Sequence, residues 1–313
     1  MKRLVLFGID GGGTATRLRI ADGENRALWE GKGEGINPNA VAPAIIAERL
    51  GSLFGDAFRE TGFHANDFAS GCLGVAGAER GPEHAELEDI LRGALGFSCP
   101  LLLTSDPDIA LVGGLKRLEG YLLIAGTGSI AICRLADGTR FRAGGLGHFL
   151  SDEGSAFFIG FQAIRRSLRS AEGRDLPTAM LDPLMERFRL DDASEFVPLI
   201  YRRFDKALIA GAADIVESRR AAGDPLAVAI MDLARDELAG LVSSVHGRVQ
   251  DRIADPSILL SGGLFDHNPW LRGSVLDSLK LQCPDLKPVE PAESASYGAC
   301  MLAIDLLKRR LDS

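Results

Sequence analysis

A glycine-rich turn between two short apolar runs constrains the fold of this chain more than any other feature. Leu4–Ile9 leads into Asp10, three glycines and Thr14, and Leu18 and Ile20 then alternate with arginines. An alternation with period two is typical of a half-buried strand, so the stretch predicts a tight β-hairpin. Two glycines would suffice for an ordinary hairpin turn. The third favours a turn whose backbone N–H groups hold an anion, with Thr14 as a further donor and Asp10 as a ligand for hydrated Mg²⁺.

The same pattern returns in the second half of the chain. Residues 120–135 contain an apolar run, the loop Gly126-Thr-Gly128, and a second apolar run from Ser129. The glycine spacing also matches a dinucleotide-binding fingerprint, but that motif requires a helix after the glycines. Here a strand follows, with another at 139–144, which disfavours NAD binding, and no P-loop sequence occurs. Two similar hairpin loops, one opening each half, predict duplicated lobes that hold nucleotide phosphates between their loops.

Composition narrows the class of protein. A chain of 313 residues is long enough for two domains, and 46% hydrophobic with 25% charged residues is typical of a soluble globular protein. The net charge of -8 argues against nucleic acid or an anionic membrane as the main partner, although a small anion such as ATP stays possible. The cysteines are widely spaced without a C-x-x-C pair, which predicts buried, reduced thiols in a cytoplasmic protein and no zinc site. No stretch approaches the length of a transmembrane helix.

Asp106 is the first candidate catalytic residue. It follows Pro100–Thr104, which we predict to be a strand buried on both faces, and it precedes Pro107. An acid before proline is the usual N-cap of a helix. The carboxyl end of a buried strand is also where open α/β sheets bind ligands. The sequence leaves both roles open for Asp106, and the two are compatible.

Three other segments combine glycines with polar groups. Residues 144–155 hold four glycines and two acids, more than a helix cap at Ser151 or Asp152 requires, which favours a ligand-facing loop. Gly262-Gly263 follows a predicted buried strand and forms either an adenosine shelf at a helix start or a tight turn. Asn37-Pro-Asn39 reads as a turn in which one asparagine caps the next helix.

The remaining periodicities define the other elements. They predict strands at 27–33, 70–77 and 256–261, and helices at 41–60, 83–95, 106 onward, 155 onward, 176–254 with its longest helix at 224–253, 268 onward, and 292–310. We expect the last helix to return to the first lobe.

These motifs together resemble the acetate-and-sugar-kinase, actin and hexokinase superfamily. More narrowly they resemble the N-acetylglucosamine kinase and glucosamine kinase branch of the BadF/BadG/BcrA/BcrD-type ATPases, over essentially the whole chain. The resemblance implies an α/β fold of two ribonuclease-H-like lobes with an interlobe cleft. The first lobe would span 1–117 plus 292–313, and the second 118–291 with a helical insertion.

The resemblance also implies a role for each motif. ATP and Mg²⁺ would be bound by Asp10, Gly11, Gly12, Gly13 and Thr14, by Gly126, Thr127, Gly128 and Ser129, and by Gly262 and Gly263 at the adenosine. Asp10 would hold Mg²⁺ directly or through water, and Asp106 would take the proton from the sugar 6-hydroxyl. The sugar would be contacted by Asn37, Gly77, Asp106, Gly145 and Asp152. Dimerisation through the helical second lobe is a family-level expectation.

Two positions depart from the family pattern. Pro107 stands where alanine is more usual, which bears on the orientation of the base beside it. Leu146 stands where the animal enzymes have a bulkier aromatic residue against the sugar, which leaves the recognition of an acetyl group open. The sequence therefore predicts an amino-sugar kinase, with N-acetylglucosamine ahead of glucosamine.

Two alternatives come from other classes of protein. An ATP-driven activator of an iron–sulfur dehydratase would need cysteines that bridge a cluster held by a dimer, and no cysteine here lies in a suitable glycine-flanked pair. A sugar sensor without catalysis is disfavoured by the intact Asp10, Asp106 and both phosphate loops. The zinc-containing sugar kinases are excluded because their clustered cysteine motif is absent.

Overall fold

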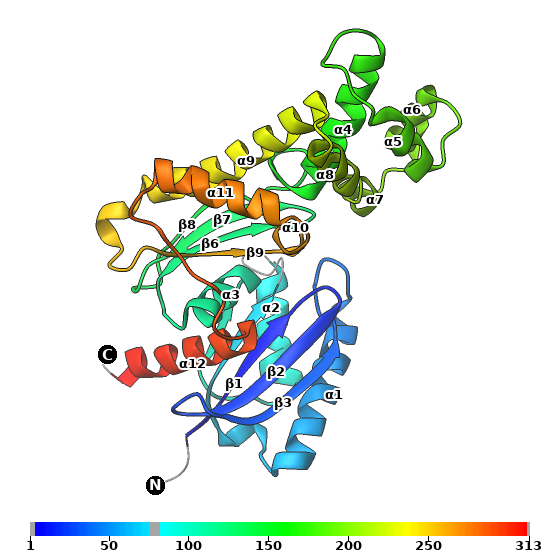
Figure 1. Ribbon diagram of the computed structural model, residues 1–313. Coiled ribbons are helices and arrows are strands. Elements are labelled where there is room, and N and C mark those ends of the chain that lie inside the picture. Colours follow the sequence, from blue (N-terminus) through cyan, green and yellow to red (C-terminus); the bar gives the residue numbers. More distant parts are fainter. Residues whose placement is uncertain (1–3, 76–81, 312–313) are drawn as a thin grey trace. The chain divides into compact units, whose positions relative to one another are not determined.

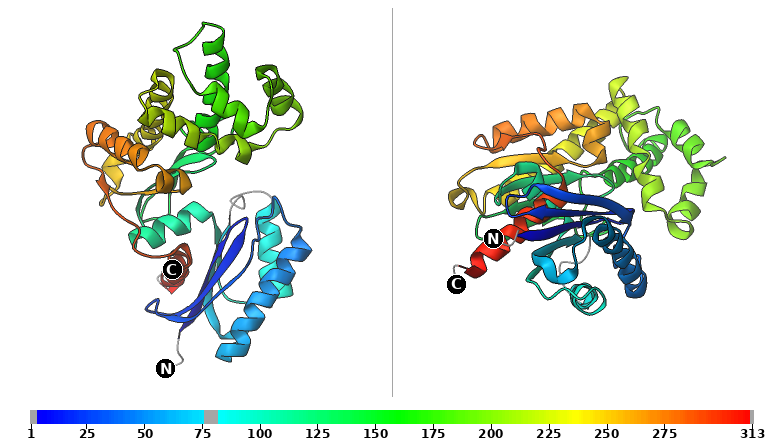
Figure 2. Two further views of the ribbon diagram at one scale, coloured as in Figure 1. Left: turned by 45° about the vertical axis from the view of Figure 1, so that its right-hand side comes forward. Right: turned by 90° about the horizontal axis from the view of Figure 1, so that it is seen from below.

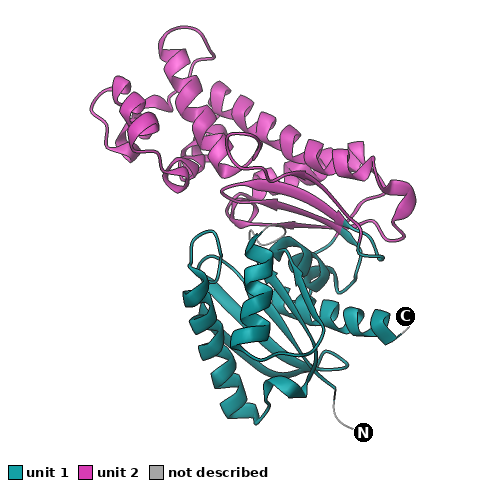
Figure 3. Cartoon of the chain, turned by 180° about the vertical axis from the view of Figure 1, so that it is seen from behind, with its two compact units in different colours: residues 1–120, 134–138, 289–313 teal, residues 121–133, 139–288 magenta. Residues whose placement is uncertain are grey.

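The computed structural model describes residues 4–75 and 82–311. The chain divides into two compact units (Figure 3): unit 1 holds residues 1–120, 134–138 and 289–313, and unit 2 holds 121–133 and 139–288. The lobe limits suggested by the sequence lie at 117/118 and 291/292, whereas the units divide at 120/121 and 288/289. Each unit is described by itself below.

Unit 1 is built on a five-stranded sheet in the order β3-β2-β1-β4-β5. Its strands are β1 (Val5–Gly11), β2 (Ala15–Asp22), β3 (Ala27–Glu34), β4 (Phe68–Val75) and β5 (Leu101–Thr104). β1 pairs antiparallel with β2 and parallel with β4, and it is buried on both faces. The predicted hairpin is confirmed, because Leu18 and Ile20 are buried and Arg17 is exposed.

Helices cover both faces of this sheet (Figures 1 and 2). They are α1 (Pro43–Thr61), α2 (Pro82–Asp89), α3 (Asp106–Leu115) and α12 (Ala295–Leu311), with short turns at Ala65–Asp67 and Ile90–Ala94. On one face the rings of Phe7 in β1 and Phe54 in α1 lie 5.2 Å apart. On the other face a Cβ on Gly8 would lie 2.6 Å from the backbone nitrogen of Cys300 in α12. The Ser70 hydroxyl also donates to the Ala303 carbonyl (2.8 Å), so the last helix completes unit 1 as expected.

Two predicted elements of unit 1 need correction. A single α-helix was expected at 83–95. The α-helical part ends at Asp89, and one π-helical turn over Ile90–Ala94 follows it. The strand expected to be buried on both faces, β5, lies at the sheet edge with Leu101, Leu102 and Leu103 only half-buried. An apolar run in the sequence does not show whether the strand is central or at the edge of its sheet. A strand at the edge is less covered by its surroundings, which is why the prediction of full burial was wrong.

Unit 2 repeats the sheet topology of unit 1. Its five-stranded sheet has the order β10-β9-β6-β7-β8, made of β6 (Gly120–Ala125), β7 (Ser129–Arg134), β8 (Arg140–Gly144), β9 (Ser257–Ser261) and β10 (Lys287–Pro288). In both sheets the first three strands follow one another, and the fourth pairs parallel with the first. The predicted α/β duplication is therefore confirmed.

The chain between β8 and β9 is helical, as predicted. It contains α4 (Ala156–Ala171), α5 (Leu181–Phe188), α6 (Phe196–Arg202), α7 (Lys206–Ala210), α8 (Ala213–Ala221) and α9 (Pro225–His246), with short 3₁₀ turns at Ala193–Glu195 and Gln250–Arg252. α10 (Gly263–His267) and α11 (Pro269–Gln282) follow β9. The helix predicted at 224–253 is shorter, because Asp224 is its N-cap and it ends at His246 before Gly247.

Two predictions about composition can be compared with the structure. All five cysteines are buried and free of disulfide bonds, as expected. Among the described helices none is long and apolar enough to cross a membrane.

Asp22 gives unit 1 a pH-dependent contact at the β2–β3 turn. Its carboxylate accepts hydrogen bonds from the backbone N–H groups of Arg26 (2.9 Å) and Glu24 (3.0 Å) and from the Arg26 Nε (2.8 Å). These bonds, the Arg26 N–H foremost, lower the pKa of Asp22 to about 2. A lowered pKa stabilises the fold above the unfolded-state value of about 4, and this contribution is lost as the pH falls toward 2.

We therefore expect Asp22→Asn to lower the urea midpoint of unfolding near neutral pH, by an amount that shrinks as the pH falls through the window from about 4 to 2. Urea titrations of both proteins across this range measure the difference. A difference that is the same at every pH would contradict the assignment of this charge.

Candidate functional site

The loop between β6 and β7 is held in place by the start of α4. The Gly126 N–H donates to the Gly128 carbonyl (2.9 Å), which closes the loop on itself. The Gly126 carbonyl accepts the N–H of Ala156, the first residue of α4 (2.9 Å). The Ser129 hydroxyl donates to the Glu153 carbonyl (2.7 Å). The predicted phosphate loop of unit 2 is thus anchored at both of its ends.

Asp152 lies against this loop as a buried carboxylate. Its Oδ1 accepts the Ser129 N–H (3.3 Å) and its Oδ2 lies 2.9 Å from the Lys206 ammonium. The side chain is 5% exposed, and the backbone has a φ of 67°, a left-handed conformation that costs energy in a residue other than glycine. A Cβ on Gly128 would lie 2.9 Å from Oδ1, so this glycine leaves the space that the carboxylate needs.

The simple capping role considered for Ser151 or Asp152 is excluded. The N-cap of α4 is Ser155, whose hydroxyl accepts the Phe158 N–H (3.2 Å). Asp152 therefore does not cap α4, and its carboxylate instead joins the glycine loop to Lys206. Gly145, at a φ of 70°, donates its N–H to the Ser129 carbonyl (2.9 Å), which ties the start of the same segment to β7.

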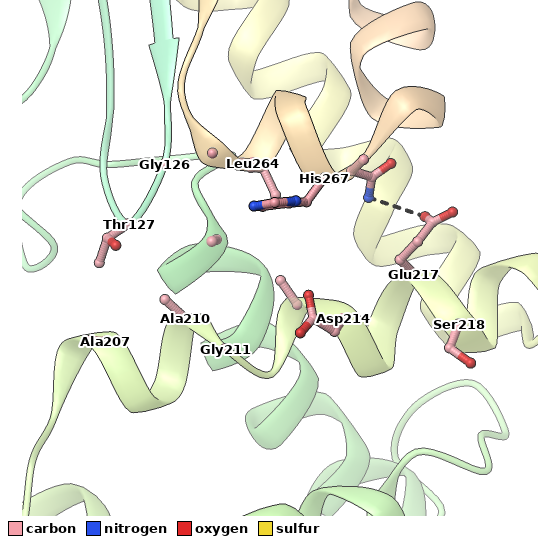
Figure 4. A pocket seen from close by; sticks show the side chains of 14 residues that line it. Gly126, Thr127, Ala207, Ala210, Gly211, Asp214, Glu217, Ser218, Leu264 and His267 are labelled. Carbon is pink, nitrogen blue, oxygen red and sulfur yellow. Dashed lines mark hydrogen bonds between the residues drawn. The ribbon is translucent and has the colours of Figure 1, made fainter.

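A pocket of about 670 Å³ opens beside this loop (Figure 4). Its volume is within the range of sites that bind small molecules. The wall from α7 and the α7–α8 turn is made of small residues, which leave room for a flat ligand. The lining residues are Gly126, Thr127, Ala156, Ala207, Ala210, Gly211, Ala213, Asp214, Glu217, Ser218, Gly263, Leu264, His267 and Asn268.

The two ends of the pocket present different polar groups. Figure 4 shows Thr127 of the glycine loop at one end and the acidic Glu217 toward the other. Glu217 is fixed by Asn268, whose Nδ2 donates to Oε2 (3.2 Å), and by Arg220 at 2.8 Å, while the Arg220 guanidinium lies 4.0 Å over the Trp270 ring. The Glu217 carboxylate is therefore an acceptor for hydrogen-bond donors of a ligand, whereas Thr127 offers a hydroxyl at the loop, where the Gly126 N–H is already bonded to the Gly128 carbonyl.

Gly262 and Gly263 have separate tasks at the β9–α10 turn. Gly262 has a φ of 111° and a ψ of 150°, a conformation available almost only to glycine. A Cβ there would lie 2.3 Å from the Ala125 carbonyl oxygen. Gly263 begins α10 and lines the pocket. The tight turn, one of the two alternatives that the sequence left open, is thus formed by Gly262, and the adenosine shelf stays a prediction for the neighbouring Gly263.

A match to a family model shows what this chain is related to. Residues 7–303 match the model of the BadF/BadG/BcrA/BcrD ATPase family. The chain belongs to this family. It is 29% identical over 299 residues to the N-acetylmuramic acid/N-acetylglucosamine kinase of Clostridium acetobutylicum, covering 95% of this chain and 97% of that protein. It is 27% identical over 304 residues to the glucosamine kinase GspK of Vibrio cholerae, covering 95% and 94%.

A solved structure shares the fold. A candidate N-acetylglucosamine kinase from Chromobacterium violaceum superposes with a TM-score of 0.72 at 24% identity, covering 98% of this chain and all of that one. The predicted α/β fold of two lobes is confirmed, with a five-stranded mixed sheet in each lobe.

Within this family fold, the predicted phosphate loop of unit 1 follows β1. The N–H of Gly12 donates to the Ala15 carbonyl (3.0 Å), so this group closes the turn and is not left open for an anion as expected. Gly13 and Thr14 are exposed. Burial raises the pKa of Asp10, and Arg17, whose guanidinium lies 3.4 Å from the carboxylate, partly offsets the rise.

Asp10 could be one ligand of a magnesium ion whose other ligands come from water and substrate. No group of three potential ligand side chains occurs in the part of the chain that the structure describes. Mg²⁺ commonly takes one or two carboxylates and completes its shell with water and substrate phosphates. The half-buried Asp10 carboxylate, whose pKa is raised by burial, fits that pattern, and the ion would share the carboxylate with the Arg17 guanidinium.

Asp106 follows the carboxyl end of β5, and Asp10 lies at the carboxyl end of β1 in the same sheet. Asp10 is in register with Gly74 of β4, and Gly74 is in register with Thr104 of β5. The carboxyl ends of β1 and β5 are therefore level, two strand spacings or roughly 10 Å apart. Of the two roles that the sequence left open for Asp106, that of N-cap is excluded. Ser105 is the N-cap of α3, its Oγ accepting the Asp108 N–H (3.4 Å), and Asp106 is the first helical residue, half-buried.

Asp108 was missed by sequence reasoning. It is buried, and its Oδ2 accepts the hydroxyls of Thr104 (2.5 Å) and Ser105 (3.0 Å). The spacing Ser-x-x-Asp at the start of a helix is a variant of the capping box and could have pointed to it. Its role is to fix the turn that carries Asp106.

The other predicted sugar contacts are placed as follows. Asn37 is half-buried in a turn, where its side chain accepts the Asn39 N–H (2.9 Å). Neither asparagine caps α1, whose N-cap is Ala42. Leu146 is 55% exposed. Gly77 lies outside the described residues.

Proposed function

We propose that this protein transfers the γ-phosphoryl group of ATP to the 6-hydroxyl of an amino sugar, with N-acetylglucosamine as the first candidate and glucosamine as the second. The observation that carries the proposal is the pocket of unit 2, with an anchored glycine loop at one end and carboxylates at the other. The Clostridium and Vibrio relatives, named as kinases of amino sugars, support this substrate class.

The pocket would bind the nucleoside and direct its phosphates to the loop. Small side chains at Ala207, Ala210 and Gly211 leave space for a purine and ribose. Ribose hydroxyls and an exocyclic amine are donors, which suits the carboxylates of Asp214 and Glu217 as acceptors. The N–H groups around Thr127 would then face the phosphates.

Unit 1 supplies the remaining groups in this proposal. Asp10 would hold Mg²⁺, directly or through water, and the exposed Gly13 and Thr14 would offer donors to the phosphates. The ion would supply neutralisation of the charge on the transferred group. Because phosphoryl transfer depends mainly on alignment and charge, the residues that fix these positions carry most of the catalysis.

Asp106 would accept the proton of the attacking hydroxyl. As the first residue of α3 it lies at the positive end of the helix dipole, which favours its ionised form. The sugar would be held by Asn37, Gly77, Gly145 and Asp152 in addition to Asp106. A homodimer formed through the helices of unit 2 and a cytoplasmic location stay predictions, which light scattering and cell fractionation can measure.

The deciding experiment measures ADP release from ATP·Mg²⁺ with separate sugars: N-acetylglucosamine, glucosamine, N-acetylmuramic acid, N-acetylmannosamine, glucose and none. We expect release that depends on an amino sugar, with a phosphorylated product identified by mass spectrometry. Release without any sugar would favour an activator-type ATPase. Sugar binding without release would favour a sensor.

A further inference from the structure

We infer that Lys206 is a positioning residue that couples nucleotide binding in the pocket to the placement of Asp152 and the 145–152 loop. This inference rests on the proposed function, because it concerns how the two substrates of that reaction influence one another. Lys206 lies 54 residues from Asp152 in the sequence, and only the fold brings the two together.

The first step is the charge of Asp152. Its carboxylate is buried, and Lys206 is the cation 2.9 Å from Oδ2, while Oδ1 is held by the Ser129 N–H. A buried carboxylate is stable as an anion only when it is paired and hydrogen-bonded. Lys206 therefore fixes both the charge and the rotamer of a residue that we assign to the sugar.

The second step is the position of Lys206 itself. It is the first residue of α7, and Ala207 and Ala210 on the same short helix line the nucleotide pocket. α7 is packed tightly on α4, since a Cβ on Gly160 would lie 2.0 Å from the Ile209 carbonyl oxygen. A ligand that presses on the small residues of α7 therefore acts on a rigid element that also carries Lys206.

A second contact joins the same two segments. Phe204 stacks on His148 with ring centroids 5.0 Å apart and an interplanar angle of 19°, and it lies 5.9 Å from the Phe149 ring. Residues 204–206 thus hold the 145–152 loop at both His148 and Asp152. This loop carries Gly145 and Asp152, the sugar contacts assigned to unit 2.

The consequence is a linkage between the two substrates. A nucleotide that contacts Ala207 and Ala210 would fix the position of α7, and with it Lys206 and Asp152, so the sugar should bind more tightly when the pocket is filled. Such coupling is reciprocal, because the sugar must tighten nucleotide binding by the same factor. Coupling of this kind typically amounts to about 5- to 150-fold.

The test compares Lys206→Met, Lys206→Arg and the matched control Lys280→Met. Lys280 forms an exposed ion pair with Asp277 on α11 of the same unit, and neither residue lines the pocket. Calorimetry would measure the affinity for the sugar that supports turnover, with and without the non-hydrolysable analogue AMP-PNP and Mg²⁺. Steady-state kinetics would give kcat and both KM values, and thermal melting would report folding.

We expect wild-type protein and Lys280→Met to show coupling of about fivefold or more. Lys206→Met should reduce that factor toward one and raise the KM for the sugar more than the KM for ATP, while Lys206→Arg restores most of the coupling. Phe204→Leu, which removes the ring stack and keeps an apolar side chain, should weaken coupling in the same direction and serves if Lys206→Met does not fold.

Two results would overturn the inference. One is a coupling factor in Lys206→Met, or in Phe204→Leu if that variant must be used, equal to that of the control. The other is an equal rise of both KM values in Lys206→Met together with a lower melting temperature, which indicates a purely structural role. A wild-type protein that binds no sugar at all would instead overturn the proposed function, and with it the inference.

Discussion

Asp106→Asn is expected to lower the turnover of sugar-dependent ADP release by about 10²–10⁴-fold, the usual loss when a general base is removed. Asparagine has the shape of aspartate but cannot accept the proton of the attacking hydroxyl. The start of α3 should survive, because Ser105 is its N-cap and Asp108 is fixed by two hydroxyls. Melting temperature and substrate affinities should therefore change little.

The experiment needs saturating ATP·Mg²⁺ and sugar, so that turnover and not binding is compared. Asp182→Asn is a matched control, because Asp182 is an exposed acid in the first turn of α5 and experiences a similar helix dipole. Turnover of Asp106→Asn equal to that of the control would remove Asp106 from the mechanism. A loss accompanied by a lower melting temperature would assign it a structural role.

Gly262→Ala is expected to destabilise the protein more than Asp22→Asn does. The residue combines a backbone conformation available almost only to glycine with a Cβ position 2.3 Å from the Ala125 carbonyl oxygen. Strained backbone and overpacking each cost about 1–3 kcal/mol, so a loss of at least roughly 2 kcal/mol in the free energy of unfolding is expected. Because Gly263 lines the pocket next to it, nucleotide affinity should fall as well.

Urea unfolding of Gly262→Ala and of Gly273→Ala measures the difference. Gly273 lies inside α11 of the same unit, and a Cβ there would meet nothing within 4 Å. Alanine at that helical position should stabilise the protein by up to about 1 kcal/mol. Equal midpoints for the two variants would show that the β9–α10 turn relaxes without cost.

Hydrophobic alternation and glycine spacing in the sequence were sufficient to predict the first strands of both sheets. The alternation around Leu18 and Ile20 and the repeated glycine hairpin defined the first strands of both sheets, and with them the duplication. The cap of α3 could not be decided from the sequence, since Ser105-Asp106-Pro107 allows a cap at either of two residues, and the Asp108 N–H bond to Ser105 decides between them. Helix ends and sheet edges depend on tertiary neighbours, which is why β5 and the end of α9 were misjudged.

The groups that the sequence did not reveal are those without a local signature. Lys206 is a single lysine in a helical region, and its partner Asp152 is reached only through the fold. The pocket wall at Ala207, Ala210 and Gly211 is defined by missing side chains, which read as ordinary helix. Glu217 of α8 and Asn268, the N-cap of α11, likewise meet across 51 residues of sequence.

The packing of α12 on β1 has a consequence for synthesis. Gly8 at the start of the chain lies directly under Cys300, and Ser70 bonds to Ala303, while nearly all of unit 2 is encoded between these segments. During translation the middle of the protein can therefore complete its core first, while the part of the first sheet that α12 covers stays exposed until residues 295–311 have been made. Exposed apolar surface of this kind promotes aggregation, so chaperone dependence should be greatest before residues 295–311 have emerged from the ribosome.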